Sequence, residues 1–551
     1  MSEIEQGKLD AATTSRGLSR RHFIQGVAAT GVGAGLLGLA ACGGDDATTE
    51  EGVTESTEAA ATGGTLRVAG GKVANPPTPF TTNDQGSLQI LGCVGEYLMW
   101  KNDKGELEPR IAESWESTDG GVTWTFKIRQ GVTFHDGSPL TTDDVVYSIA
   151  SHLDEANASN QAGTFGGILT ADGVTAVDDT TVQIVCAAPT GALPNLLSST
   201  TYGLIMIKSG EAGGDGWQST MNSCGPWVLN TYTEGDRTTF TRNDSYWDTT
   251  RTPAFDSMEL IQFDSADAAV AQLLAGELDA VSLVEASTAA TIDTNVADLV
   301  RVGSAAHLSI HLRNDFGPFQ DKRVRKAAAL TLNRADYLTG VLQGEGVVGN
   351  DSLIDAFPDL KDTSVAQREQ DLEAAKALMA EAGVEGFDVD LSSYSRDDIN
   401  LLAPYLKSSF AEIGINVTIK QADSYYSEPW SSLDSKQVEN NIWLESNFGI
   451  TDFGHRGSPD VVLNRVFKST GDWNAAQYKS DDMDAAIDEF IAATTPDARK
   501  AAAKKIQEIS LEDTPYILLY FPTATAAVRK GLTGFYTNGM AQFESAAVRS
   551  A

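Results

Sequence analysis

Residues 372–421 read LEAAKALMAEAGVEGFDVDLSSYSRDDINLLAPYLKSSFAEIGINVTIKQ. Two segments, 372–383 and 402–413, place apolar side chains at helical spacing, and a glycine closes each of them, as glycine often closes a helix. In the segments that follow, 387–391 and 415–419, apolar and polar residues alternate as they do in a half-buried strand. Helices that alternate with strands predict an α/β body with mostly parallel sheets.

The same kind of unit precedes this stretch. An alanine-rich segment that starts at residue 265 has helical spacing, stops at Gly276 and is followed by a strand-like run, 278–281. The alternating run 123–128 predicts a strand, and the threonines and aspartates at 141–144 predict the capped start of a helix. The sequence contains no internal repeat and no second low-complexity linker, so its domains are expected to share crossing segments of chain.

The chain is acidic and contains enough apolar residues to bury a core. It has 551 residues, with 40 Lys or Arg against 76 Asp or Glu, which gives a formal charge of −36. Nucleic-acid binding needs clustered cations, so we expect no nucleic-acid partner. The chain is 41% hydrophobic, and its length suggests about two to four globular domains at roughly 150 residues each. No apolar run approaches the ~20 residues of a spanning helix, which excludes a polytopic membrane protein.

The first 42 residues have the pattern of an export signal. Arg20 and Arg21 precede a weakly apolar stretch, residues 27–41, which ends at Cys42. The arginine pair resembles the twin-arginine signal of bacteria, and residues 39–42 resemble the lipobox cut by the lipoprotein signal peptidase. The resemblance implies that residues 1–41 are a signal peptide and that Cys42 carries a lipid. The alternative is an ordinary N-terminal helix with a buried cysteine.

Residues 43–63 contain no aromatic side chain and hardly any branched apolar one. Such a segment cannot offset its ordering entropy by burial. Residues 42–63 are therefore expected to be a lipidated cysteine and a flexible tether, which would hold a folded body at the extracytoplasmic face of the cell membrane.

Three further cysteines, Cys93, Cys186 and Cys224, lie in the body. Outside the cytoplasm one disulfide and one free thiol are permitted, and three buried thiols agree with the sequence equally well. No CxxC or Cys/His spacing predicts a metal site.

The patterns of common hydrolases and nucleotide-binding enzymes, G-x-S-x-G, H-E-x-x-H and the P-loop, are absent from the sequence. His307 and His311 lie on one face of an alternating strand, but four strand residues span roughly 13 Å, too far for one metal. A catalytic site of dispersed carboxylates is the remaining enzymatic alternative. We predict a protein that is not an enzyme and that has no cofactor and no metal.

Six stretches of the body resemble one known family. In chain order they are GVTFHDGSPLTTDDVVYS (131–148), CGPWVL (224–229), RNDSYW (242–247), LLAGELDAV (273–281), PFQDKRVRKAAALTLNR (318–334) and LEAAKALMAEAG (372–383). Together they resemble the family 5 extracellular solute-binding proteins of bacterial ABC importers, whose members bind peptides, dipeptides, nickel complexes or opines. Asp244 stands where the family usually has proline.

The resemblance implies a two-lobe α/β protein with the periplasmic-binding-protein fold of type II, in its large peptide-binding form, with a hinge between the lobes. Lobe I would comprise residues 64–304 plus 521–551, and lobe II residues 305–520. The resemblance further implies a monomer that captures a small molecule between its lobes and delivers it to the permease and ATPase subunits of an ABC importer. Most shared motifs are structural, and Arg323 and Arg325 are expected to pair with carboxylates or cap helices.

The stretch FGITDFGHRGSPDVVLNRVFKSTGDWN (448–474) corresponds to the part of lobe II that carries specificity in this family. It departs from the W-x-A-D-Y-x-D-P pattern of many peptide binders. It is closer to relatives with W-x-x-R-P, which places Phe453 at the aromatic position and Arg456 at the arginine position. An aromatic ring offers a flat apolar wall, and arginine offers a planar fork for a carboxylate. The alternative for Arg456 is a salt bridge between the lobes.

Three further residues complete the predicted ligand site. Asp452 would accept a ligand ammonium, or else serve as a helix cap or turn acid. Trp473 and Trp430 would be stacking walls, or else core residues. On the lobe I side, the loop of residues 75–84 is expected to border the cleft.

Peptide is the ligand that family membership favours. An opine, a sugar-like solute or a metal chelate remains open, because the family's amine-binding signature is altered here. The alternative role is a receptor that presents its ligand without being coupled to transport.

Overall fold

The computed structural model describes residues 63–73, 76–82, 84–102, 105–211, 215–423, 425–426, 441–539, 543–545 and 548–550. All of them belong to one compact unit, Ala59–Ala551. The signal residues Arg20 and Arg21, the lipidation candidate Cys42 and the ligand candidate Trp430 lie outside the described residues. The predictions for these four residues stay predictions.

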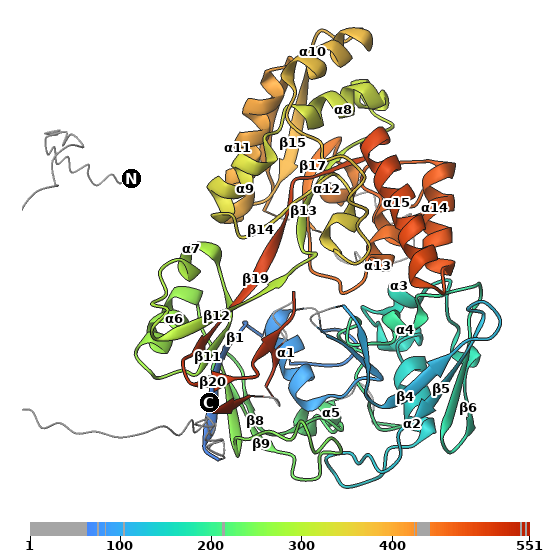
Figure 1. Ribbon diagram of the computed structural model, residues 1–551, viewed down its shortest axis with the longest axis vertical. Helices are drawn as coiled ribbons and strands as arrows, with labels where there is room; N and C mark the ends of the chain where they lie inside the picture. Colours follow the sequence, from blue (N-terminus) through green and yellow to red (C-terminus); the bar gives the residue numbers. More distant parts are fainter. Residues whose placement is uncertain are drawn as a thin grey trace, which may run out of the picture. The chain divides into compact units, whose positions relative to one another are not determined.

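The first half of the body is built on an eight-stranded sheet. Side chains along β1 (Thr65–Gly70) alternate between the two faces of the sheet. Leu66 and Val68 enter a core shared with helix α1 (Gln85–Val94), and Ala69 enters a core shared with α6 (Ala266–Leu274). Helices therefore cover both faces of the sheet, with α1 on one side and α6 on the other (Figure 1). The strand order is β12 (Ala297–Gly303), β19 (Tyr520–Arg529), β11 (Ala280–Val284), β1 (Thr65–Gly70), β10 (Ser257–Gln262), β9 (Arg237–Arg242) and β8 (Trp227–Thr233), with β14 (Gly346–Val348) paired to β19.

A four-stranded antiparallel sheet follows α1 in the chain. Helix α2 (Thr142–Ala150) packs Val145 and Ile149 into the core of this sheet. The helix begins at the predicted cap, because the Thr141 hydroxyl accepts from the backbone N–H of Asp144 and the Asp144 carboxylate accepts from the backbone N–H of Thr141. The strand order is β4 (Ala112–Glu116), β5 (Thr123–Ile128), β7 (Thr181–Val185) and β6 (Val174–Asp178).

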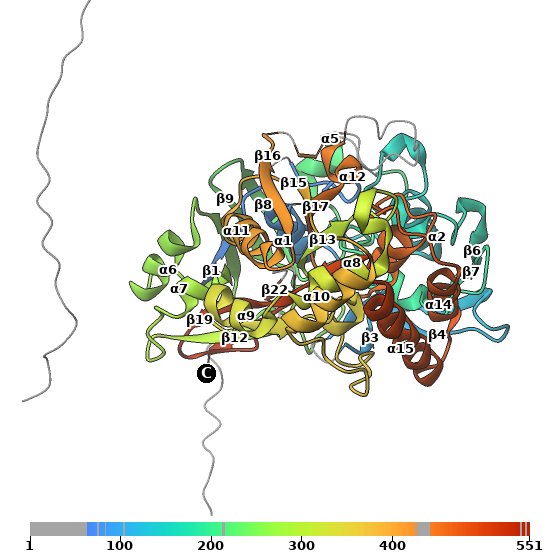
Figure 2. The same ribbon diagram turned by 90° about the horizontal axis from the view of Figure 1, so that it is seen from above.

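The second half is built on a five-stranded sheet. Helices α8 (Lys322–Leu330), α10 (Leu372–Glu381) and α11 (Asp397–Ala411) share one core with it, and α14 (Asp481–Ala492) and α15 (Pro496–Asp513) share another. Figures 1 and 2 show α10 and α11 on the opposite side of this sheet from α14 and α15. The strand order is β16 (Ile415–Gln421), β15 (Phe387–Ser393), β17 (Phe448–Phe453), β13 (His307–Leu312) and β18 (Tyr516–Leu518).

The unit predicted from residues 372–421 is confirmed, since β15 and β16 are parallel and α11 connects them. The prediction of mostly parallel sheets is wrong. Parallel pairs join β1 to β10 and β11, and β15 to β16 and β17, whereas the other described pairs of the three larger sheets are antiparallel. Short hairpins such as β8–β9 and the long return strand β19 produce the antiparallel pairs.

Shorter elements complete the described fold. They are β2 (Met99–Lys101), β3 (Leu107–Pro109), α3 (Ala162–Phe165), α4 (Leu193–Leu196), α5 (Asp215–Thr220), α7 (Ala286–Ala289), α9 (Arg334–Leu342), α12 (Ile442–Glu445), α13 (Asp460–Val462), β20 (Leu532–Thr533), β21 (Tyr536–Thr537), β22 (Phe543–Glu544) and β23 (Arg549–Ser550).

The chain passes twice between the eight-stranded and five-stranded sheets. Residues 304–306 link β12 to β13, and Leu519 links β18 to β19. In Figure 1, β19 is the long strand that runs from the level of the second sheet down into the first. Both links are short, so the two sheets are closely connected along the chain.

The structure also places the three cysteines of the body and the two arginines at the start of α8. Cys93, Cys186 and Cys224 are all buried and unpaired, which is the three-thiol alternative. Arg323 pairs with Asp321 at 2.5 Å, and Arg325 donates to the carbonyl of Asp513 at the end of α15, so one pairs with a carboxylate and the other caps a helix.

A buried ion cluster lies beside Leu519, the link between β18 and β19. Asp351 is fully buried and has a positive φ of 60°. Its carboxylate accepts hydrogen bonds from Arg334 at 2.9 Å, from the backbone N–H of Leu518 at 3.1 Å, and from Arg368. Both guanidinium groups are themselves buried, so the carboxylate is their necessary counter-charge.

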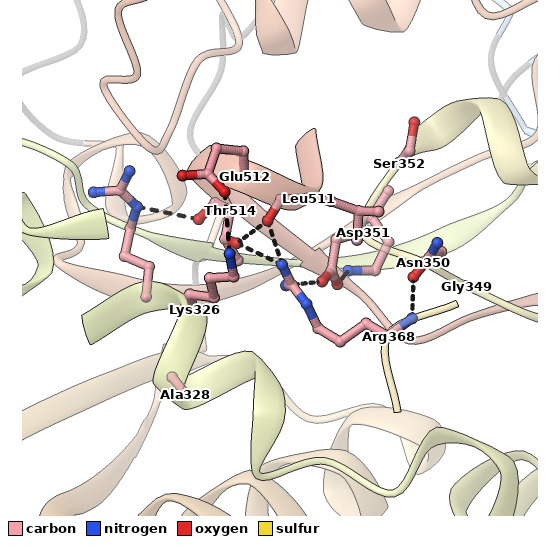
Figure 3. Close-up of polar contacts among 12 residues, drawn as sticks. Lys326, Ala328, Gly349, Asn350, Asp351, Ser352, Arg368, Leu511, Glu512 and Thr514 are labelled. Atoms are coloured by element: carbon pink, nitrogen blue, oxygen red, sulfur yellow. Dashed lines mark hydrogen bonds and ion pairs between the residues drawn. The ribbon is translucent and has the colours of Figure 1, made fainter. Parts of the chain in front are cut away.

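Arg368 extends the cluster to the end of α15. It donates to the carbonyl of Leu511 and to the hydroxyl of Thr514, where the helix ends in a left-handed conformation (Figure 3). The cluster thus holds the end of α15 and the backbone of β18 in fixed positions directly before the chain crosses to β19.

Asp351→Asn should lower the free energy of unfolding by about 3–5 kcal/mol, the scale for breaking a buried ion pair. Asparagine keeps the size of the side chain and tolerates a positive φ, so the loss would come from the charge. Urea unfolding followed by circular dichroism measures the change, with the exposed Asp179→Asn as control. An unfolding midpoint equal to that of the wild type would show that the cluster is dispensable.

Candidate ligand-binding site

A short segment after β17 connects the second half of the body to the first. His455, Arg456 and Gly457, here called the bridging segment, lie between β17 and α13. The hydroxyl of Tyr202 donates to the carbonyl of His455 at 2.8 Å, and Nζ of Lys101 donates to the carbonyl of Gly457 at 2.6 Å. Side chains from the first half of the chain therefore hold both carbonyl groups that flank Arg456.

The bridging segment is packed too closely for added atoms. A Cβ on Gly457 would lie 2.5 Å from Cγ2 of Thr200. The backbone N–H of Ala305, in the link between β12 and β13, donates to Nδ1 of His455 at 2.9 Å, so Nδ1 carries no proton. Burial, together with the charges of Arg456 and Lys101, lowers the pKa of His455 to about 3, and the imidazole is neutral.

The side chain of Arg456 borders a partly open cavity of about 70 Å³, here called the cleft cavity. Thr82, Asn160 and Gln161 line it from the first half of the chain, and Arg465 and Trp473 line it with Arg456 from the second. Its described lining contains two guanidinium groups and no carboxylate. A cavity of this size holds a few water molecules at most, so a larger ligand requires its walls to be farther apart.

Arg456 has no counter-ion among the described residues. Its one hydrogen bond within this part of the chain goes to the carbonyl of His455, at 3.0 Å. Burial lowers the pKa of its guanidinium, Tyr202 acts in the opposite direction, and the charge of Arg465 lowers it further. The alternative of a salt bridge between the two halves is therefore not seen in the described residues, and the cation faces the cavity.

Arg465 and Trp473 form a second wall of the cleft cavity. The guanidinium of Arg465 pairs with Asp472 at 2.5 Å and lies over the Trp473 ring, 3.5 Å from its centre. The ring nitrogen of Trp473 is buried and has no hydrogen-bond partner within the described structure. Because Arg465 is already paired, Arg456 supplies the unbalanced positive charge of the cavity.

Phe453 stands beside this wall without lining the cavity. Its ring stacks on His307 at a centre-to-centre distance of 5.3 Å and lies 6.1 Å from the ring of Trp473. These ring contacts are those of a packing residue next to Trp473. Phe453 is not among the residues that line the cleft cavity, so nothing in the described structure supports its predicted role as a ligand wall.

Asp452 is occupied by partners from the protein. Its carboxylate accepts from Arg396 at 2.7 Å, from the hydroxyl of Tyr426 at 2.5 Å, and from the hydroxyl of Tyr394. Burial raises the pKa of Asp452, but Arg396 and the two hydroxyl groups outweigh it and leave the pKa below its ordinary value. Asp452 lies in β17 and is neither a helix cap nor a turn acid.

The structure brings Arg456 and Trp473 to one cavity, together with Thr82 from the loop that was expected to border the cleft. Sequence reasoning missed Arg465, Tyr202 and Lys101. Arg465 lies in the same quoted stretch as Arg456 and could have been named as a second cation. Tyr202 and Lys101 carry no sequence signal, because their partners are backbone carbonyl groups more than 250 residues away.

Neither a metal-binding cluster nor a membrane-spanning helix is found among the described residues. No three His, Cys, Asp or Glu side chains come together there in a way that could hold a metal ion. None of the helices in the described ranges is both long and apolar enough to cross a bilayer.

The sequence model of bacterial extracellular solute-binding proteins, family 5, matches residues 106–507. The chain belongs to this family. Its predicted family and its mixed α/β fold, shared with two-lobe binding proteins, are both confirmed. Proteins of this family are the non-catalytic, solute-binding components of ABC importers, which act outside the cytoplasm, bind small ligands and work with permease subunits.

Characterised relatives match along most of their length. Heme-binding protein A of Haemophilus influenzae is 26% identical over 490 residues, which cover 83% of this chain and 86% of that protein. The oligopeptide-binding protein AppA of Bacillus subtilis is 26% identical over 501 residues, which cover 83% of this chain and 87% of that protein. The structure of HbpA2 from Haemophilus parasuis has a TM-score of 0.75 at 22% identity and covers 89% of this chain and 100% of that one, which shows a common fold.

Tyr202→Phe should weaken the contact between the two halves by about 1 kcal/mol, the net worth of one neutral hydrogen bond. The equilibrium would shift about fivefold towards a more open form. Small-angle X-ray scattering should then report a larger radius of gyration. The control is Tyr232→Phe, because the hydroxyl of Tyr232 has no hydrogen-bond partner within the described structure. If both variants scatter like the wild type, Tyr202 does not hold the halves together.

Proposed function

We propose that the protein captures peptides, such as oligopeptides and dipeptides, and delivers them to the membrane permease of an ABC importer. The observation that carries this proposal is the guanidinium of Arg456, which has no counter-ion in the described structure and faces a cavity walled by both halves of the chain. A carboxylate would balance this charge through a bidentate pair of hydrogen bonds, and a peptide carries one at its C-terminus. The relative named as an oligopeptide-binding protein supports the same ligand class.

We infer that residues 64–304 plus 521–551 form lobe I and that residues 305–520 form lobe II. The five-stranded sheet lies entirely within the second range, and the eight-stranded sheet draws its strands from the first, apart from β14 and the first residue of β19. The boundaries fall at the two links between the sheets, where a hinge would bend.

In this proposal, the ligand is captured by binding alone, without a covalent step. A ligand enters while the lobes are apart and places its carboxylate on Arg456. The lobes then close on the ligand and exclude water from the ion pair, with the walls of the cleft cavity farther apart than in the arrangement described here. The ligand drives closure because it binds the closed arrangement more tightly than the open one.

A non-peptide carboxylate is the second candidate ligand. The observation that favours it is the pairing of Asp452 with Arg396, which leaves no free carboxylate in the described lining of the cavity for a peptide ammonium. A site with one unbalanced cation would also suit an opine, an acidic sugar-like solute, a metal chelate or the propionates of heme, and one relative is named as a heme-binding protein.

Arg456→Gln should weaken the bound ligand by about 1.5–3 kcal/mol, the scale for a hydrogen bond to a charged group. Native mass spectrometry of the purified full chain would first identify the co-purified molecule. Calorimetry would then compare its affinity for the wild type, for the variant and for Arg313→Gln, which removes a surface arginine paired with Asp315. An affinity that is unchanged by Arg456→Gln would exclude Arg456 from the site. A released solute without peptide bonds would replace peptide with the second candidate.

We also propose that the protein is a lipoprotein held at the extracytoplasmic face of the cell membrane and that it acts as a monomer. Arg20 and Arg21 would direct export, residues 1–41 would be removed, Cys42 would carry the lipid, and residues up to 63 would serve as the tether. The pattern of residues 19–42 supports this proposal.

Cys42→Ala should move the protein from the membrane fraction to the soluble extracytoplasmic fraction without changing its affinity for ligand, because the lipid alone would provide the attachment. Fractionation of cells followed by immunoblotting checks this, with Ser56→Ala in the tether as control. Continued retention of the Cys42 variant in membranes would rule out the lipid anchor.

A further inference from the structure

A second cavity, of about 400 Å³, is lined by His455 and Gly457, whereas Arg456 between them borders the cleft cavity. Thr200 and Tyr202 border both, so the bridging segment and Tyr202 separate two chambers. We call the larger one the hinge cavity, because it is also lined by Ser304, in the link between β12 and β13, and by Phe521, two residues after the link between β18 and β19. Its volume falls within the range of roughly 300–1,000 Å³ that is usual for small-molecule sites.

Lys101 offers the hinge cavity a positive charge that no carboxylate contacts directly in the described structure. Its ammonium group donates one hydrogen bond, to the carbonyl of Gly457, and has no carboxylate at ion-pair distance within the described structure. Two of its three N–H donors therefore have no protein partner there. Burial lowers the pKa of Lys101, while nearby Asp359 acts in the opposite direction. An anionic group that entered the cavity would meet a cation already stripped of much of its water.

His455 adds a neutral donor to the same cavity. Because Nδ1 accepts from the backbone of Ala305, the ring proton must be on Nε2. Nε2 has no hydrogen-bond partner among the described residues, and the ring lines the cavity. The protein thus presents an ammonium group and an imidazole N–H, a pair of donors that suits a carboxylate.

Asp359 brings the opposite charge from the second half of the chain. A Cβ on Gly105 would lie 3.7 Å from Cε of Lys101 and 3.9 Å from Cγ of Asp359, so the two charged side chains flank the same glycine. Asp359 itself has no hydrogen bond or ion pair in the described part of the chain. Val347, Phe357 and Phe521 add apolar surface to the lining.

We propose that the hinge cavity is a second solute site for a small zwitterion with an apolar side group, such as a free apolar amino acid. Its carboxylate would bind Lys101 and Nε2 of His455, and its ammonium group would bind Asp359. A simple anion fits less well, because Asp359 would repel it, and a simple cation would be repelled by Lys101.

Occupancy of the hinge cavity favours the arrangement of the two halves described here. Its lining comes from both halves, from the link between β12 and β13 and from the start of β19, so the complete site exists only while Lys101 and Tyr202 hold the bridging segment. By linkage, the zwitterion would raise the affinity for a cleft ligand that also favours this arrangement, and it would lower the affinity for one that requires the walls of the cleft cavity to be farther apart.

Three matched probes test the site on the full chain by calorimetry: L-leucine, L-leucine methyl ester, which lacks the carboxylate, and 4-methylpentanoate, which lacks the ammonium group. L-leucine should bind about tenfold more tightly than either analogue, the scale of one partly exposed charge-assisted contact. Asp359→Asn should remove the preference for L-leucine over 4-methylpentanoate. Lys101→Met should remove the preference over the methyl ester.

Asp390→Asn is the matched control, because Asp390 is an exposed carboxylate without a hydrogen-bond partner in the described structure. It should leave all three affinities unchanged, and equal unfolding midpoints would establish that the variants are folded. No binding of L-leucine to the wild type would overturn the proposal. So would L-leucine binding that survives both Asp359→Asn and Lys101→Met, since the amino acid would then occupy another place.

Discussion

The structure depends on how the chain is fixed where it crosses between its two large sheets. Asp351 binds the guanidinium groups of Arg334 and Arg368 and the backbone of Leu518, two residues before β19 begins. Because the carboxylate and both cations are buried, removing the carboxylate would leave two uncompensated cations in the interior. The start of β19 is therefore anchored to the second sheet, and its long pairing with β12 and β11 transmits that position to the first.

The electrostatics of the cleft follow from what is paired elsewhere. The chain has a large negative charge, and most of its described arginines have a carboxylate or carbonyl groups around them, as Arg465 has Asp472. Arg456 has neither a carboxylate nor full access to water, so its charge is felt strongly at short range and is screened at long range. Recognition would rest on contact inside the cavity, because the field of the whole protein repels an anion that is still at a distance.

The local parts of this structure could be predicted from the sequence, and the long-range parts could not. Residues 372–421 fix two helices and two parallel strands, because apolar periodicity and closing glycines act over a few residues. The antiparallel pairing of β13 with β17 joins residues far apart in the chain, and no pattern within either strand records its partner. The same limit applies to the site. The chemistry of Arg456 is evident from its side chain. Asp452, in contrast, is paired with Arg396 and Tyr394, which lie more than 50 residues away in the chain.

The two halves approach each other closely at Gly457, where a Cβ would lie 2.5 Å from Cγ2 of Thr200. Even a methyl group at this position would require Thr200 or the bridging segment to move. A larger residue at position 457 would keep the two halves slightly farther apart while leaving the charge of Arg456 in place. Two properties of such a protein can therefore change independently during evolution. Position 457 would alter the size of the solute that it retains, and position 456 the chemical group that it recognises.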